Sequence, residues 1–197
     1  MFTRWLTRLA TVEEATEREE LEAIYRFRYN VYVREFNVSQ HPDADHGTNM
    51  LSDEEDESPY ASHFYTGTPD AMTSAMRLRS WPAGEVPDDV FDKYTMSIFP
   101  GIEDLNVAEV AKMMIQPTLR GKLLYPSLLC AGFEFLAKEK AVDLVFLYSV
   151  PGVISHYVKQ GARVYGAQIS AMQTMVPLVI VMSDYEHLKK CGSAVAP

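Results

Sequence analysis

The chain has 197 residues, of which 47% are hydrophobic and 23% are charged. That balance is typical of a folded chain, and the length suits one domain, residues 1–197, with a substantial core. A formal net charge of −9 argues against general nucleic-acid binding. No apolar run reaches membrane-spanning length and the first ten residues lack a signal-peptide core. We therefore expect a cytoplasmic protein without an integral membrane segment.

The N-terminal part predicts a long helix followed by a polar loop. Thr11 is a plausible helix start, and apolar residues recur at helical spacing through EREELEAIYRFRYNVYVREF. Arg28 interrupts this apolar stripe, where it either snorkels at the margin or carries a charge toward an internal site. Residues 37–60 are polar and have no clear period, which predicts a solvated loop. We assign no metal, because no recognised site has the spacing of His41, Asp43, Asp45 and His46.

The rest of the chain predicts strands that alternate with helices. Period-two alternation, apolar runs and turn residues set the expected ranges. Strands are predicted at 61–66, 71–80, 105–115, 142–149, 162–169 and 175–182, a short helix within 81–101, a long helix after residue 122, and a helix at 153–160. This order predicts an α/β sandwich.

The strand at 71–80 carries two arginines on one face, Arg77 and Arg79. Two neighbouring guanidinium groups can fork onto a carboxylate, which favours a role in holding a substrate. Their alternative role is to pair with acids of the preceding loop, Asp53 or Asp56.

The stretch from Leu105 to Lys140 predicts a central strand, a basic turn and a long helix. Within the strand, Glu109 shares a face with apolar residues such as Val107 and Ala111. Burial disfavours the charged form of a carboxyl group, so the pattern predicts a raised pKa for Glu109, which suits a general base. The turn that follows is a candidate anion site, because backbone amides at a helix N-terminus would lie beside basic side chains. Its residues are Arg120, Gly121 and Lys122.

This strand, the loop QPTLRGKLL and the helix together resemble the acyl-donor segment of the GNAT acyltransferase superfamily. The resemblance implies a single GNAT-like domain with a mixed, mostly antiparallel central sheet flanked by helices. Leu123 and Tyr125 stand where the superfamily usually has further glycines, so the loop should hold the pyrophosphate of coenzyme A poorly. The expected donor is therefore an acyl carrier protein bearing an acyl-phosphopantetheine arm, with no tightly bound cofactor.

The segment RFRYNVYVREF resembles the first-helix motif of acyl-homoserine lactone synthases and N-acyl amino acid synthases. Arg28, Val31 and Tyr32 match that motif. Lactone synthases carry a tryptophan farther along, and residues 35–38 here lack it, which argues against the lactone branch.

Two further positions resemble the lactone synthases. Asp53 and Asp56 show the D-x-x-D spacing found before their next strand, and Glu109 aligns with their strand glutamate. Lys112 stands where they have an arginine, which keeps the charge but loses the fork geometry.

The resemblance implies an N-acyl amino acid synthase that transfers a long-chain fatty acyl group to the amine of an amino acid, with N-acyltyrosine as the expected product. Glu109 would take a proton from the amine. Tyr157 falls where many acetyltransferases hold a tyrosine that protonates the leaving thiolate, and its alternative role is packing. The acceptor would be bound by Arg28, Tyr32, Arg77 and Arg79, and the oxyanion by backbone amides at Met113, Met114 and Ile115.

Three alternatives remain open on the same residues. An acyl-homoserine lactone synthase would use the same fold and donor. An acetyl-coenzyme A-dependent N-acetyltransferase would need the loop to accept pyrophosphate. A non-catalytic member would serve as an acyl-binding or carrier-docking module, and substitution of Glu109 would leave its behaviour unchanged.

Overall fold

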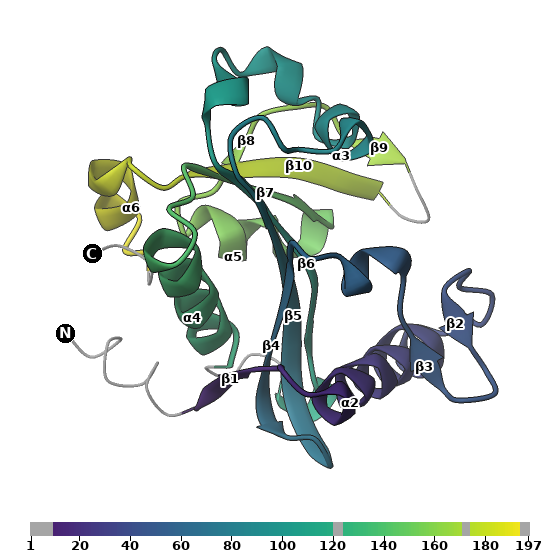
Figure 1. Ribbon diagram of the computed structural model, residues 1–197. Coiled ribbons are helices and arrows are strands. Elements are labelled where there is room, and N and C mark those ends of the chain that lie inside the picture. Colours follow the sequence, from purple (N-terminus) through teal and green to yellow (C-terminus); the bar gives the residue numbers. More distant parts are fainter. Residues whose placement is uncertain (1–9, 120–123, 171–173, 194–197) are drawn as a thin grey trace. The chain divides into compact units, whose positions relative to one another are not determined.

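A computed structural model describes residues 10–119, 124–170 and 174–193 of the chain (Figure 1). The described chain divides into two compact units. Unit 1 contains the described residues up to Leu78 together with Lys112–Gly132, and unit 2 contains Arg79–Ala111 and the described residues from Phe133 onward. The predicted donor turn, Arg120, Gly121 and Lys122, lies outside the described residues.

The predicted mixed, mostly antiparallel sheet is confirmed. Its strand order is β1-β4-β5-β6-β7-β10-β8, with β9 paired to β10. β6 and β7 run parallel, whereas β10 is antiparallel to β7, β8 and β9, and β1 to β4. The strands are β1 Val12–Glu14, β4 Ala61–Thr68, β5 Ala71–Trp81, β6 Val107–Ile115, β7 Leu144–Ser149, β8 Arg163–Val164, β9 Ile169–Ser170 and β10 Thr174–Val181.

Helices connect these strands, and a separate two-stranded hairpin lies in the polar loop. The hairpin pairs β2 Ala44–Asp45 with β3 Met50–Leu51. Short 3₁₀ turns occur at Glu54–Glu57, Met96–Ile98, Ile102–Asp104, Pro117–Leu119 and Pro151–Val153. The α-helices are α2 Arg18–Tyr29, α3 Asp88–Lys93, α4 Leu124–Lys138, α5 Ile154–Val158 and α6 Tyr185–Lys190. No helix of the described residues has the length and apolar character needed to cross a membrane.

The start of the first long helix differs from the prediction. The residues after Thr11 form strand β1, in which Val12 pairs with Thr66 of β4. The helix begins at Arg18, where Glu17 and Glu20 form a reciprocal capping box. Pairing with a distant strand satisfies the backbone of β1, and no local pattern at Thr11 could reveal that partner.

The helix then changes its hydrogen-bonding pattern. α2 passes into a π-helical turn, Asn30–Glu35, where the amide of Phe36 donates to the carbonyl of Val31 at 3.0 Å. In unit 1 the apolar face of α2 lies along β4 and β5 (Figure 1). Buried residues of both layers form this core: Ile24, Tyr25, Phe27, Val31, Tyr65, Met72, Ala75 and Met114.

The central strand β6 starts at Val107 and contains an irregularity. Lys112 has a φ of 50°, a left-handed backbone conformation that is uncommon for a residue other than glycine. Such a residue bulges a strand, so the predicted strict alternation across residues 105–115 is wrong at this point. After the bulge Met114 is buried, whereas Met113 and Ile115 are half-buried.

In unit 2, β10 pairs with β7 in antiparallel register along six residues, from Val176 opposite Ser149 to Val181 opposite Leu144. The predicted strand at 162–169 is shorter than expected, because β8 contains only Arg163 and Val164. Gly161 follows α5 with a φ of 95°, a left-handed conformation that glycine adopts readily after the end of a helix. α6 was not among the predicted helices.

Candidate functional site

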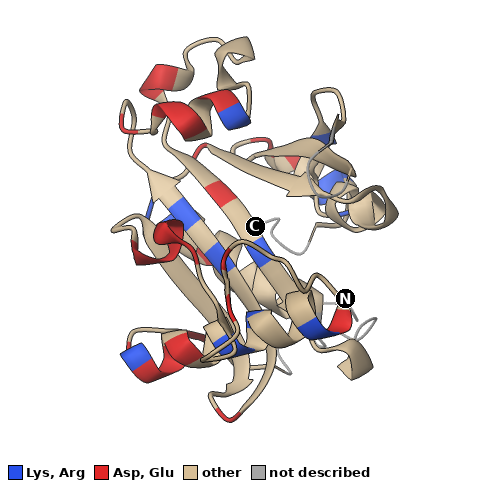
Figure 2. Cartoon of the chain, turned by 90° about the vertical axis from the view of Figure 1, so that its right-hand side faces the viewer, with Lys and Arg blue, Asp and Glu red and all other residues tan. Residues whose placement is uncertain are grey.

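Glu109 lies in β6, and its side chain is completely buried. It stands opposite Phe146 in the parallel pairing of β6 with β7, between the buried residues Ala108 and Val110. Figure 2 shows charged residues on the strands of the sheet itself, besides those on helices and loops. A buried carboxylate needs hydrogen-bonding or ionic partners to offset its lost hydration. The fold supplies them from two other segments of unit 2.

We call these residues the Glu109 centre: Glu109, Arg79, Lys93 and Tyr94. Glu109 Oε1 accepts hydrogen bonds from Lys93 Nζ and Tyr94 Oη, each at 2.6 Å. Its Oε2 accepts from Arg79 Nε at 2.7 Å. Arg79 and Tyr94 are buried, whereas the side chain of Lys93 at the end of α3 is 41% exposed. Lys93 is therefore the member of the centre that reaches solvent.

These contacts reverse the predicted pKa shift of Glu109. Burial raises the pKa, as the sequence analysis expected, but Lys93 and Arg79 lower it and the hydroxyl of Tyr94 adds to their effect. The net result is a pKa lowered from 4.5 to about 2. The prediction of a raised pKa was wrong, because it considered the strand neighbours of Glu109 and not the cations that other segments bring to it. Glu109 is an ionised carboxylate at neutral pH.

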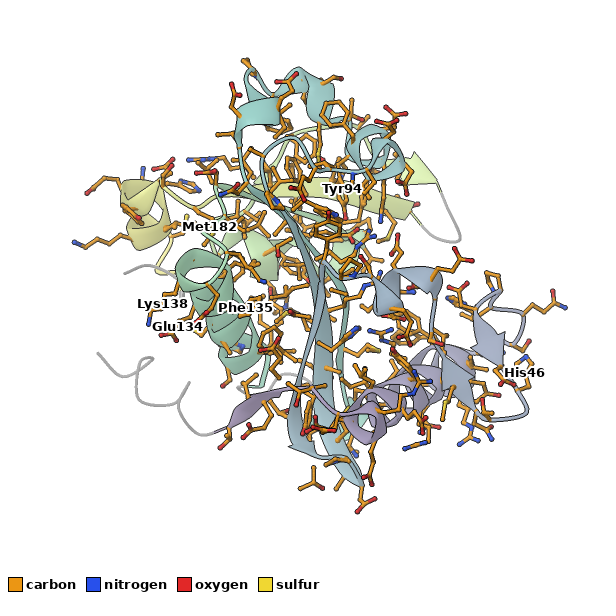
Figure 3. All side chains as sticks on the ribbon, in the orientation of Figure 1. His46, Tyr94, Glu134, Phe135, Lys138 and Met182 are labelled. Carbon is orange, nitrogen blue, oxygen red and sulfur yellow. The ribbon has the colours of Figure 1, made fainter. Side chains whose placement is uncertain are left out.

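An aromatic cluster holds the segment that carries Lys93 and Tyr94. The ring of Tyr94, labelled in Figure 3, stacks on Tyr148 with centroids 4.9 Å apart and planes inclined by 21°. Tyr148 Oη donates to the carbonyl of Lys93 at 2.5 Å, and Tyr165 Oη donates to the carbonyl of Tyr94 at 2.8 Å. Burial and the nearby Glu109 raise the pKa of Tyr94 well above its ordinary value, so its hydroxyl keeps its proton. Sequence reasoning missed Lys93 and Tyr94, because a connector between strands carries no periodic signal.

A second charged group lies in unit 1, and we call it the buried ion network: Arg28, Arg77, Asp53, Glu55 and Asp56. Arg28 Nη1 donates to both carboxylate oxygens of Asp56, at 2.6 and 2.7 Å. Arg77 Nη1 donates to Asp53 at 2.5 Å and to Asp56 at 2.9 Å, and its Nη2 donates to Glu55. The side chains of Arg28 and Asp56 are fully buried, and that of Arg77 is 1% exposed. The network is therefore a desolvated cluster held by mutual pairing.

The network settles two alternatives left open by the sequence. The interpretation of Arg28 as a snorkelling side chain is wrong, since none of that side chain is exposed. The pairing of Arg77 with Asp53 and Asp56 is confirmed. Arg79 pairs with Glu109 instead. An arginine that already contacts three carboxylates has little capacity left for the carboxylate of a substrate.

His63 connects the two oppositely charged sides of the network. Its Nδ1 lies 3.2 Å from Arg28 Nη2, which can only donate, so Nδ1 accepts and the ring proton lies on Nε2. Nε2 then donates to the backbone carbonyl of Asp56 at 3.2 Å. Burial and the neighbouring Arg28 lower the pKa of His63, which favours this neutral form.

Lys112 extends the same network from the bulge of β6. Its Nζ lies 3.0 Å from Asp53 Oδ2 and 3.9 Å from Asp43. Burial raises the pKa of Asp53, but the neighbouring Arg77 and Lys112 lower it by more. The net pKa of Asp53 therefore lies well below the usual range of an aspartate. The left-handed conformation at Lys112 thus places a cation against an acid that the polar loop supplies.

The remaining predicted residues lie on several elements. Tyr32 lies on the π-helical turn with its ring centroid 6.0 Å from that of His41, and burial raises its pKa. Tyr157 is half-buried on α5. Their predicted roles, and the oxyanion role of the backbone at Met113, Met114 and Ile115, stay predictions. Within the described ranges, no group of three or more histidine, cysteine or acidic side chains could hold a metal ion.

Unit 1 also contains an open cavity of about 570 Å³. It lies between the end of α2, the β4–β5 turn and the residues that follow β6. Its wall combines apolar side chains with amide and charged groups, among them Phe27, Met72, Arg26, Asn30 and Gln116. That volume falls within the range of small-molecule pockets.

Comparisons with known proteins identify the fold. No protein-family model matches the sequence, and none of the curated proteins matches it. Among solved structures, FeeM, an N-acyl amino acid synthase from uncultured soil microbes, matches 93% of this chain and 97% of its own, with a TM-score of 0.71 and 16% identity. BjaI, a CoA-dependent acyl-homoserine lactone synthase, matches 93% and 90% with a TM-score of 0.66 and 13% identity.

A third similar structure is a putative N-acetyltransferase from Lactobacillus plantarum, with a TM-score of 0.61 and 16% identity over 87% of this chain and 97% of its own. At such identities the likeness concerns the fold and not the substrate. The order of strands and helices and these matches together give the chain a GNAT-like fold, as the loop resemblance predicted.

Proposed function

We propose that this protein is an N-acyltransferase that moves a long-chain fatty acyl group from a thioester donor to the amino group of an amino acid. The observation that carries the proposal is the Glu109 centre. A fully buried, ionised carboxylate lies on the central strand of a GNAT-like fold, and one of its partners reaches solvent. An ionised carboxylate at that position can accept a hydrogen bond from an incoming amine or ammonium group.

In the proposed reaction the amine nitrogen attacks the carbonyl carbon of the thioester. A carbon–nitrogen bond forms, the carbon–sulfur bond breaks, and the nitrogen loses a proton to Glu109 directly or through water. Burial raises the pKa of Glu109 and so favours this step, whereas Lys93 and Arg79 lower that pKa and oppose it. Tyr157 is the proposed donor of a proton to the leaving thiolate.

The proposed oxyanion site is the backbone of Met113, Met114 and Ile115. These residues follow Lys112, whose left-handed backbone interrupts the regular strand geometry at that point. Amides aimed at the carbonyl oxygen of the thioester would stabilise the charge that develops there during attack.

For the donor we propose an acyl carrier protein with its phosphopantetheine arm. Leu123 and Tyr125 replace small residues that would let a pyrophosphate approach the backbone. A coenzyme A thioester is the second candidate donor, because the similar structure BjaI is named as CoA-dependent.

For the acceptor we propose an amino acid, with tyrosine as the first to test. This choice is supported by the similarity of the fold to that of FeeM, an N-acyl amino acid synthase, with a TM-score of 0.71. The lactone synthases have a similar fold, so acyl-homoserine lactone formation is the second candidate reaction.

The test is acyl transfer by the purified protein, followed by mass spectrometry of the product. Palmitoyl-acyl carrier protein, palmitoyl-coenzyme A and acetyl-coenzyme A are each supplied with a mixture of amino acids and, separately, with S-adenosylmethionine. We expect an N-palmitoyl amino acid from the carrier-protein donor. Turnover with acetyl-coenzyme A alone, or a lactone product, would contradict the proposed reaction.

Glu109→Gln is the matched variant, and we expect it to lower the rate about 100-fold or more, the usual contribution of general base catalysis. Glu134→Gln is its control. Glu134 lies on α4 with a side chain that is 62% exposed and pairs with Lys138 (Figure 3). Equal rates for both variants would remove Glu109 from the reaction.

A further inference from the structure

Lys93 differs from the other partners of Glu109 in its exposure. Its ammonium donates to Glu109 Oε1 at 2.6 Å, yet 41% of its side chain is exposed while that of Glu109 is fully buried. An ammonium group has three donors, and Glu109 accepts one of them in this structure. Lys93 can therefore bind a second anion on its solvent-exposed side without leaving the first at once.

The pair of opposite charges is complementary to a free amino acid. An α-amino acid carries an ammonium and a carboxylate on one carbon, and Glu109 and Lys93 present a carboxylate and an ammonium in direct contact. If the acceptor binds with its ammonium against Glu109 and its carboxylate against Lys93, each charge lies next to an opposite charge. Charge-assisted hydrogen bonds of this kind are stronger than neutral ones.

The other cations of the candidate site are poorly suited to this task. Arg28 and Arg77 are buried in their own network with carboxylate partners. The side chain of Arg79 is 5% exposed and contacts Glu109. Lys93 combines a flexible stem, a solvent-facing position and direct contact with the reactive carboxylate.

We propose that Lys93 binds the carboxylate of the acceptor amino acid, exchanging its contact with Glu109 for that carboxylate while the acceptor's amino group takes its place at Glu109 Oε1. This role rests on the proposed N-acyltransferase function and names the group that makes the enzyme select carboxylated acceptors. The backbone of Lys93 stays in place during the exchange, because Tyr148 Oη holds its carbonyl at 2.5 Å.

The exchange also links acceptor choice to the reactivity of Glu109. Burial is the largest influence on the pKa of Glu109 and raises it, while Lys93 is the largest of those that lower it. When Lys93 moves to the acceptor carboxylate, it no longer lowers the pKa of Glu109, whereas burial still raises that pKa. Glu109 then becomes a better base. An amine without a carboxylate leaves Lys93 on Glu109 and finds a weaker base.

The test compares L-tyrosine with tyramine, which has the same side chain and amino group but no carboxylate. The measured quantity is the ratio of kcat/KM for tyrosine to that for tyramine, in the wild type, Lys93→Met, Lys93→Arg and the control Lys138→Met. Lys138 is a 69% exposed lysine of α4 that pairs with Glu134. We expect the ratio to fall about tenfold or more in Lys93→Met, as for loss of one charged hydrogen bond, and to stay near the wild-type value in Lys93→Arg and Lys138→Met.

A ratio that stays constant in Lys93→Met, even with both rates reduced, would overturn the inference, because a merely structural lysine affects both amines equally. If the wild type acylates neither amine, the choice of tyrosine as the acceptor fails, and calorimetry decides the role of Lys93 separately. Tyrosine binding that is about tenfold weaker in Lys93→Met than in the wild type would then support a carboxylate site at Lys93. Equal binding, or no binding to the wild type, would overturn it.

Discussion

The two charged clusters of this protein use similar residues in different proportions. In the buried ion network, two arginines face three acids, and its central members Arg28 and Asp56 have no exposed side-chain surface. In the Glu109 centre, one acid faces a lysine, an arginine and a tyrosine hydroxyl, and the lysine is 41% exposed. A cluster closed to solvent can stabilise or specify a structure, whereas one with an exchangeable partner can also bind a ligand.

The comparison therefore separates a cluster that is closed to solvent from one that keeps a solvent-exposed partner. Asp56 accepts from Arg28, Arg77 and the backbone amide of Asp53, so its removal affects several partners at once. Glu109 also has several partners, but the ammonium of the half-exposed Lys93 side chain can be hydrated by solvent when the carboxylate is lost. Substitutions in the two clusters should consequently differ in what they damage most.

The largest effect on folding is expected for Asp56→Asn. The change leaves two buried arginines without their shared carboxylate, and breaking a buried ion pair from one side costs about 3–5 kcal/mol. We expect the free energy of unfolding, measured by urea titration, to fall by that amount. Glu57→Gln is the control, because Glu57 is 61% exposed and pairs at the surface with Arg18. Such a pair contributes less than about 1 kcal/mol. Equal losses for the two variants would contradict the structural role assigned to Asp56 in the buried ion network.

The next effect is on the dependence of stability on pH. The pKa of His63 is lowered in the folded protein by burial and by Arg28, so the unfolded chain takes up the proton first. Its contribution to stability is therefore complete above the ordinary histidine pKa near 6.5 and is lost as the pH falls below that value. Glu109, with a pKa lowered to about 2, contributes fully above 4.5 and loses its contribution as the pH falls toward 2.

Urea titrations at pH 7.5 and 5.5 check the expected loss of the stability contributed by His63. We expect the wild type to lose stability between these values and His63→Gln to lose less. His41→Gln serves as the comparison variant. Burial and Lys112 lower the pKa of His41 as well, but His41 is not a member of the buried ion network. An unchanged pH dependence in His63→Gln would show that the buried ion network does not respond to protonation of this ring.

The smallest effect is expected for Tyr148→Phe, which sharpens the assignment of Lys93. The change keeps the stacking on Tyr94 and removes the hydrogen bond to the carbonyl of Lys93. We expect a loss of stability of about 1 kcal/mol, typical of one neutral hydrogen bond, together with a raised KM for the acceptor. Tyr165→Phe removes the corresponding bond to the carbonyl of Tyr94 and is the control. A raised KM in both variants alike would mean that the aromatic cluster supports the segment in general and not Lys93 in particular.

Much of the fold could be predicted because its signals are local. Alternation and turn residues located β4 and β5, and the apolar run located β7. Two of the failures share one cause. Strand β1 depends on pairing with β4, and the bulge at Lys112 accompanies its contact with Asp53. Each depends on a partner distant in sequence, which no local pattern encodes.

The candidate site divides in the same way. Glu109 was identifiable because an acid within an apolar strand is unusual, and Arg77 because it shares a strand face with a second arginine, Arg79. The pKa of Glu109 was predicted in the wrong direction, since burial was visible in the sequence and its neutralising partners were not. Lys93 and Tyr94 come from a short connector with an ordinary composition, so their presence beside Glu109 follows from the fold alone.

The sequence by itself determined the class of fold, the order of most of its elements and the strand that carries Glu109. These features depend on the spacing of apolar and polar residues along the chain, which is a local property. The tertiary structure alone decided which cation meets which carboxylate, how strongly each is desolvated and which side chain still reaches water. Those properties depend on distances between remote segments, and electrostatic interactions change with distance and burial far more than with sequence spacing.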